Sequence, residues 1–182
     1  SRNAINVWTD NSLWLMSFVG PPFIFKFQQM GTNCGLISPH GAVDFDGRTI
    51  WMGIDNFYTY SGQTKQLNCT VKDHVFNDFN FSQSDKVYGG INSEFSEVIW
   101  LYPSETNSLA SGGSGENDKY VIYNYKDDIW YYGNLSRSAW IDRGIRTFPI
   151  AAESGYLYNH EFEYDDDGSA MTSFIESAPM DI

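Results

Sequence analysis

The densest group of side chains that could bind a cation is the acidic run Asp165-Asp166-Asp167-Gly168-Ser169. Adjacent carboxylates are suitable ligands for a hard cation such as calcium. Calcium-binding loops, however, alternate their acidic residues in the pattern D-x-[DN]-x-[DN]-G, which this run does not follow. We therefore interpret the run as a solvated turn, and we interpret Asp127-Asp128 as a hairpin turn for the same reason.

The histidines and cysteines do not form a recognisable site either. His160-Glu161-Phe162-Glu163 lacks the second histidine, four residues after the first, that a zincin helix needs. His40 and His74 lie far from it in the sequence, so no metal site is predicted. Cys34 and Cys69 have no metal-ligand spacing and are expected to be buried free thiols. Only proximity in sequence supports Cys34 and His40 as a nucleophile pair.

Motifs for phosphate binding and acyl transfer are also missing. The glycine-containing segment Gly31-Thr32-Asn33-Cys34-Gly35 lacks the Lys-Ser/Thr of a phosphate loop, and the chain has no G-x-S-x-G motif. No motif supplies a nucleophile, a base and an orienting group together. We therefore predict a protein that is not an enzyme, with no catalytic residue, no cofactor and no bound metal.

The elements around these residues are predicted to be strands. Aromatic residues make up 17% of the chain, charged residues only 19%, and there are 16 glycines. Aromatic residues suit the half-buried surface of a sheet, and glycines suit its turns. Ala4 to Thr9 and Leu13 to Val19 are short apolar runs separated by the turn Asp10-Asn11, and Phe23 to Phe27 alternates at period two. Asp46-Gly47 is a hairpin signal before Ile50-Trp51-Met52.

Two stretches depart from this pattern. Between Val71 and Phe81 the apolar residues recur at spacings of three and four, which predicts a short helix near Asp73 to Asn80, with Asp73 as its cap. The polar segment 104–118 contains Ser111-Gly112-Gly113-Ser114-Gly115 and is expected to be a flexible loop between two strands. We expect residues 1–182 to form a single β-rich module that includes this loop.

A weak repeat suggests how the strands are grouped. Trp51 and Trp100 are 49 positions apart, and each is followed by a second aromatic strand, Phe57 to Tyr60 and Tyr120 to Tyr125 respectively. A degenerate third unit is Gly155 to Tyr158 followed by Phe162 to Tyr164. The period is near the roughly 40–50 residues of propeller blades. The predicted fold class is thus all-β, with antiparallel β-propeller-like blades, although a jelly roll or a sandwich would give similar patterning.

Several segments resemble the tail proteins of podoviruses. They are Cys34-Gly35-Leu36-Ile37-Ser38-Pro39, Ile50-Trp51-Met52-Gly53, Phe57 to Gly62, Val71 to Asp78, Trp130-Tyr131-Tyr132-Gly133, Arg137-Ser138-Ala139-Trp140, Leu157 to Glu161, Asp165 to Gly168 and Ser173 to Ser177. The family is the tail nozzle, or packaged-DNA stabilisation, protein, related to tubular tail proteins. The resemblance spans roughly Ile5 to Ile182 and is carried by strand signatures, not by a catalytic motif.

The resemblance implies a β-propeller core within a larger subunit of the virion tail. Copies of such a subunit assemble into a ring, commonly sixfold, below the portal and adaptor proteins, and DNA passes through the ring and is retained by it. This chain, at 182 residues, is much shorter than the family's proteins. It opens with Ser1-Arg2, and Ala178 to Ile182 reads like an interrupted strand. We therefore expect it to be a fragment of a larger propeller-containing subunit.

The charge is compatible with a DNA conduit. The formal net charge is −12, which repels phosphates and anionic membrane surfaces, and no apolar run is long enough for a membrane span. Specific DNA binding is therefore not expected, although an acidic wall could line a passage through which DNA slides. Solubility alone also accounts for the charge. An alternative function is a carbohydrate-binding or glycoside-cleaving propeller, although the S-x-D-x-G-x-x-W boxes of sialidases are missing.

Overall fold

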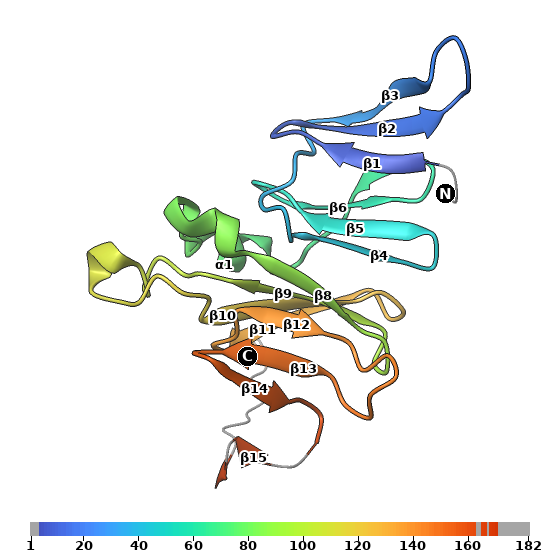
Figure 1. The fold of residues 1–182 in the computed structure, drawn as a ribbon. Helices are drawn as coiled ribbons and strands as arrows, with labels where there is room; N and C mark the ends of the chain where they lie inside the picture. The colour runs from blue at the N-terminus through green and yellow to red at the C-terminus, as the bar shows by residue number, and fades with distance from the viewer. Residues whose placement is uncertain (1–3, 163–164, 167, 171–182) are drawn as a thin grey trace, which may run out of the picture.

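A computed structural model describes residues 4–162, 165–166 and 168–170 of the chain (Figure 1). These residues form 16 strands grouped into five antiparallel sheets, and in each sheet neighbouring strands are consecutive in the sequence. The prediction of an all-β, antiparallel fold is confirmed. Every sheet is a meander, because each strand pairs antiparallel with the next strand along the chain.

The sheets follow one another along the chain. The first sheet contains β1 (Ala4–Trp8), β2 (Ser12–Phe18) and β3 (Phe25–Thr32). The second contains β4 (Ala42–Phe45), β5 (Arg48–Met52), β6 (Phe57–Tyr60) and β7 (Thr64–Gln66). The third contains β8 (Tyr88–Asn92), β9 (Glu97–Tyr102), β10 (Lys119–Asn124) and β11 (Ile129–Asn134). The fourth contains β12 (Ala139–Ile141), β13 (Ile150–Glu153) and β14 (Tyr156–Asn159), and the last is the hairpin of β15 (Asp165–Asp166) and β16 (Ser169–Ala170).

The four larger sheets are stacked face to face, because the strands in the middle of the stack bury both of their faces. In β9, Val98, Trp100 and Tyr102 point into a core shared with the second sheet, whereas Ile99 and Leu101 point into a core shared with the fourth. A strand buried on both faces should be apolar at every position, as β9 is after Glu97. The sheets succeed one another from β1–β3 at one end to β12–β14 near the other (Figure 1).

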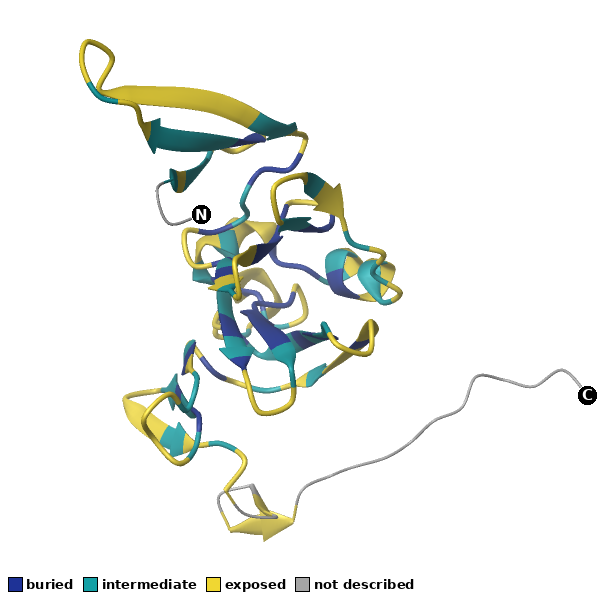
Figure 2. Cartoon of the chain, turned by 90° about the vertical axis from the view of Figure 1, so that its right-hand side faces the viewer, coloured by how far each residue is buried: buried dark blue, intermediate teal, exposed yellow. Residues whose placement is uncertain are grey.

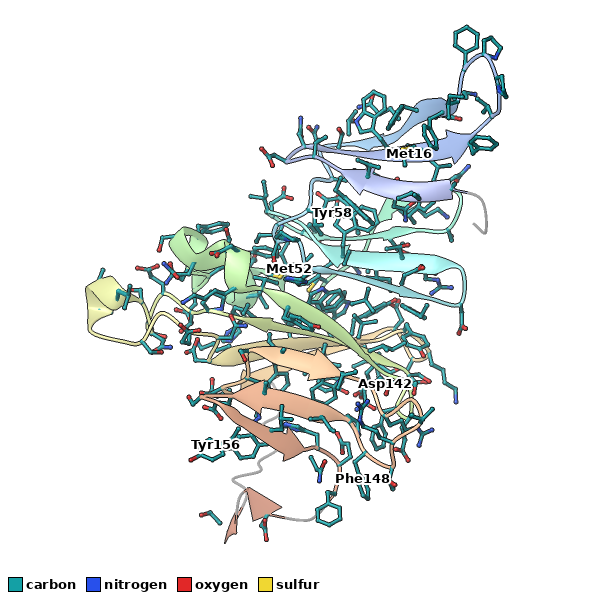
Figure 3. All side chains as sticks on the ribbon, viewed as in Figure 1. Met16, Met52, Tyr58, Asp142, Phe148 and Tyr156 are labelled. Carbon is teal, nitrogen blue, oxygen red and sulfur yellow. The ribbon has the colours of Figure 1, made fainter. Side chains whose placement is uncertain are left out.

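The same alternation links the second sheet to the first. Ile50 and Met52 of β5 face the third sheet, whereas Trp51 packs against Leu13 of β2 and Tyr58 of β6. Figure 3 shows Met52 and Tyr58 among the side chains that fill the spaces between sheets. Figure 2 shows buried residues concentrated in the middle of the stack and exposed residues along the β2–β3 hairpin.

The first strands of the second, third and fourth sheets lie next to one another. β8 contacts both β4 and β12, and the Gly89 amide donates a 2.7 Å hydrogen bond to the His40 carbonyl just before β4. Two glycines of β8 permit this approach. A Cβ at Gly90 would lie 2.4 Å from Cδ1 of Trp140, and a Cβ at Gly89 would lie 2.9 Å from a methyl carbon of Val43.

The predicted helix is present, but the prediction of Asp73 as its cap was wrong. Helix α1 spans Lys72–Asn77 and follows Val71 without a side-chain cap, so Asp73 lies inside the first turn, where a carboxylate favours the helix dipole. Two 3-10 helices, η1 (Phe81–Lys86) and η2 (Leu109–Ser111), lie outside the predicted range. No helix in the described part of the chain is long and apolar enough to cross a membrane.

The predicted turns agree closely with the structure, whereas the predicted ends of the strands agree less well. Asp46 and Gly47 both have positive φ and join β4 to β5, as the hairpin signal predicted. β3 begins at Phe25, so Phe23 lies in the connection that precedes it and not in the strand. In the third repeat unit, β14 pairs with β13, and its expected partner strand falls partly on residues 163–164, which lie outside the described residues.

Residues 104–118 connect β9 to β10 and have a defined local structure. The Asn107 side chain donates to the Ser114 hydroxyl and to the Glu116 carbonyl, and Gly115 donates its amide to the Asn107 carbonyl. Lys86 lies 2.7 Å from the Glu116 carboxylate. These hydrogen bonds fold the segment back on itself between the two paired strands.

Candidate functional site

The acidic run lies at the C-terminal hairpin. The Gly168 amide donates a 3.0 Å hydrogen bond to the Asp165 carboxylate, and Gly168 has positive φ, which is the geometry of a tight turn. Asp167 lies outside the described residues. Asp128 is likewise a turn residue with positive φ and accepts a hydrogen bond from Tyr123. In the part of the chain that the structure describes, no three His, Cys, Asp or Glu side chains gather in a way that could hold a metal ion.

The three histidines lie on separate elements, each against an aromatic ring. His40 stacks on Tyr88 with ring centroids 5.4 Å apart, and His74 stacks on Tyr132 at 3.7 Å. His160 lies 5.0 Å from Trp140. The structure therefore does not bring the histidines together.

The cysteines are free, as expected, and their environments disfavour the thiolate. Cys34 is buried, and this burial raises the pKa of its thiol. Burial also raises the pKa of the Cys69 thiol, to about 11. Because the thiolate is the nucleophilic form, neither residue is activated in this state.

Gly35 of the glycine-containing segment has a packing role, since a Cβ there would lie 1.9 Å from the Asp10 carbonyl oxygen.

A polar pocket of about 520 Å³ lies beside the fourth sheet. Its lining residues are Asp118, Asn134, Leu135, Ser136, Arg137, Glu153, Tyr158 and Ser169. Arg137 is almost fully buried, and its guanidinium lies 2.5 Å from the Glu153 carboxylate and 4.3 Å from the centre of the Tyr158 ring. This cation connects the segment before β12 to both β13 and β14.

Two further hydrogen bonds position Arg137. One terminal nitrogen donates to the Ser136 carbonyl at 2.7 Å, and Nε donates to Nε2 of His160 at 3.1 Å. A guanidinium has five N–H donors in a fixed fork, so three separate acceptors and a stacked ring define its position closely. Arg137 was noted in the sequence only as part of a resemblance, because its partners are 16 and 23 residues away.

A second polar cluster, also unrecognised in the sequence, lies at the start of β9. Desolvation, and then the charge of Glu161, raise the pKa of the Glu97 carboxyl to about 7. The Tyr131 hydroxyl donates to Glu97, and Asn92 donates to Glu161 at 3.4 Å. The alternation of side chains along β9 could have predicted the position of Glu97. Glu97 shares the face of β9 that carries Ile99 and Leu101, so it points toward the fourth sheet.

The described residues thus present two polar clusters, one around Arg137 and one around Glu97. In both clusters, the side chains interact mainly with one another. These interactions link strands of the third and fourth sheets to the segments that precede β12 or follow β14. Comparison of the chain with models of protein families and with curated protein sequences finds no match.

Proposed function

We propose that this chain is a structural, non-enzymatic module of a bacteriophage tail. In this proposal it forms propeller-like blades of a nozzle or hub, in a ring of copies through which DNA passes and by which it is retained. The stack of meander sheets whose first strands meet at β4, β8 and β12 is the observation that carries the proposal. Blades that converge on their first strands are the arrangement expected of a propeller, which the resemblance to tail nozzle proteins implies.

The tryptophan repeat supports the grouping into blades. Trp51 and Trp100 occupy the second strand of their sheets, and each side chain points toward the preceding sheet in the stack. Both indoles are fully buried and donate to a backbone carbonyl. The 49-residue period therefore corresponds to one sheet, which agrees with the expectation for a blade.

The charge supports a passage that does not grip DNA. With 23 acidic and 11 basic residues, the chain repels phosphates at short range, and mobile cations screen the rest within about 8–10 Å. A basic wall would instead bind DNA by counterion release and oppose its movement. Retention in this proposal comes from constriction or plugging elsewhere, and the acidic side chains are concentrated on the channel side of the ring.

The polar pocket beside the fourth sheet gives the carbohydrate alternative less support. A sugar-binding site needs an open aromatic face and free polar groups. Here Arg137 covers the Tyr158 ring and pairs with Glu153. A glycan array with the purified chain addresses this alternative, and specific glycan binding that is lost in Tyr158→Ala would favour it over the tail proposal.

The tail proposal is tested on phage particles that encode this chain. Antibodies raised against the purified chain should place gold label on the tail, and images of the parent protein should show rings with a central channel. Fluorescence anisotropy with labelled duplex DNA should show weak binding. Label on the capsid alone, or tight DNA binding that weakens steeply with salt, would contradict the proposal.

A further inference from the structure

One face of the first sheet is apolar and has no partner among the described residues. Trp8 and Leu13 point toward the second sheet, so alternation along the strands places their neighbours on the opposite face. We call this opposite face the head face. Its apolar side chains are Ile5, Val7, Trp14, Met16, Phe18, Phe25 and Phe27, and the polar Gln29, which pairs with Trp14, lies on the same face.

The side chains of the head face lie in register across the three strands. Ile5, Met16 and Phe27 form one row, and Phe18 pairs with Phe25. Ile5, Phe18, Phe25 and Phe27 are each between 53% and 65% exposed. Since a buried aromatic side chain covers roughly 150–250 Å², the phenylalanines alone expose about 300 Å². An apolar patch of this size on a folded protein marks an interaction site.

A second face without a partner among the described residues lies at the other end of the stack. Trp140 and Ala151 of the fourth sheet pack on the third sheet, so their neighbours in the strands face the other way. We call that side the tail face. It carries Ala139, Ile141, Ile150, Ala152, Leu157 and Asn159. Leu157 is 75% exposed and Ile141 is 51% exposed.

Neither face carries a charge from its strands. The only charged residue of β1–β3 is Lys26, which lies on the side of the second sheet with Gln28. The only charged residue of β12–β14 is Glu153, which pairs with Arg137 on the side of the third sheet. A sheet face exposed to solvent normally carries polar side chains, and here the charged side chains of both sheets are directed away from these faces.

We propose that the head face of one copy packs on the tail face of a second copy of this chain. Every sheet has one face toward the preceding sheet of the chain and one face toward the following sheet. Within the chain, each contact joins the second kind of face on one sheet to the first kind of face on the next, as at Trp100, which points back to the second sheet. The head face is on the side of the first sheet where a preceding sheet would pack, and the tail face is on the side of the fourth sheet where a following sheet would pack. Only a head-to-tail contact therefore continues the internal geometry, and it is heterologous. The proposal rests on these two faces and not on the tail function.

Sedimentation velocity of the purified chain and its variants tests this contact. The wild type should associate increasingly up to about 100 µM, a concentration at which micromolar interfaces are occupied. Phe27→Asp, which disrupts the head, and Leu157→Asp, which disrupts the tail, should each be monomeric. An equimolar mixture of the two variants retains one intact head and one intact tail, so it should form dimers and nothing larger.

Gln28→Asp is the matched control, because it adds the same charge to the same strand on the opposite side. It should associate like the wild type. Circular dichroism checks that each variant is folded, and Phe25→Asp or Ile141→Asp replaces one that is not. A monomeric wild type overturns the proposal. Dimers of Leu157→Asp alone also overturn it, because they would show a head-to-head contact.

Discussion

The indole Nε1 of Trp100 donates a 2.9 Å hydrogen bond to the carbonyl oxygen of Gly41, 59 residues earlier in the chain. Trp51 makes the equivalent bond, at 3.0 Å, to the carbonyl of Cys34. Both acceptors lie in the connection between β3 and β4. Two successive sheets are thus tied to one connecting segment by the same residue type in the same strand position.

Replacement of Trp100 by Phe should destabilise the chain by about 2 kcal/mol. The substitution removes a buried donor and part of a core ring, although the Gly41 carbonyl retains the Met52 amide as a partner. Urea unfolding followed by circular dichroism measures the change. Trp14→Phe is the control, because the Trp14 indole is only partly buried and bonds to the nearby Ser12 hydroxyl, so its cost should stay below about 1 kcal/mol. Equal costs at the two positions would contradict the role given to Trp100.

Gly90→Ala should destabilise the contact between the third and fourth sheets. The new methyl would overlap the Trp140 ring, which is held by its own hydrogen bond to the Ile91 carbonyl. Overpacking of this kind typically costs about 1–3 kcal/mol. The measurement is a double-mutant cycle with Trp140→Ala, in which the alanine at position 90 should cost much less once the ring is gone. Additive effects of the two substitutions would argue against the contact.

Glu97 should make stability fall as pH rises. Its folded-state pKa of about 7 lies above the ordinary value of 4.5, so the folded chain holds a proton that the unfolded chain has released between these values. Stability from this group is therefore full below about pH 4.5 and is lost as pH rises to about 7. Glu97→Gln should remove this slope and stabilise the chain at pH 8 by roughly 1 kcal/mol, since partial exposure reduces the nominal effect.

Thermal unfolding of wild type and Glu97→Gln between pH 4 and pH 8 measures this difference. Glu105→Gln is the matched control, because Glu105 is exposed. Its unfolding curve should follow that of the wild type at each pH. A wild-type slope that persists unchanged in Glu97→Gln would assign the pH dependence to other groups.

Glu153→Gln should cost about 1–3 kcal/mol of stability, because it leaves the buried Arg137 cation without its counter-charge. The ion pair between Arg143 and Glu94 offers a direct comparison, since both of its side chains are more than 40% exposed. Glu94→Gln should therefore change stability by less than about 0.5 kcal/mol. Denaturant unfolding of both variants decides between a buried and a screened pair, and similar small changes would show that water screens Arg137.

Local features of the fold could be predicted from the sequence with good accuracy. Short apolar runs bounded by turn residues identified β1, β2 and β6, and Asp46-Gly47 located a hairpin, because these signals depend on neighbouring residues only. The spacing between Val71 and Phe81 likewise located α1, although Asp73 was not its cap. A cap depends on where the backbone leaves the helical region, and the residue types alone did not determine that position.

The candidate clusters could not be predicted in the same way. Arg137 meets Glu153 and His160 only because β12, β13 and β14 pair in one sheet. Glu161, which follows β14, is 64 residues from Glu97 in the sequence, so its effect on the pKa of Glu97 arises from the stacking of sheets. The sequence did contain one usable sign, a carboxylate on the core-facing side of β9.

The meander order of the sheets has a consequence for how the chain folds during translation. Each sheet is made of consecutive strands and packs mainly on the sheet before it, so most of its pairings have low contact order. The stack can therefore be assembled in the order of synthesis, with each finished meander serving as a template for the next. When the chain has been synthesised to Gln66, the side of the second sheet that carries Ile50 and Met52 still lacks its cover. Apart from the head face, folding of this kind keeps exposed apolar surface on the sheet completed last.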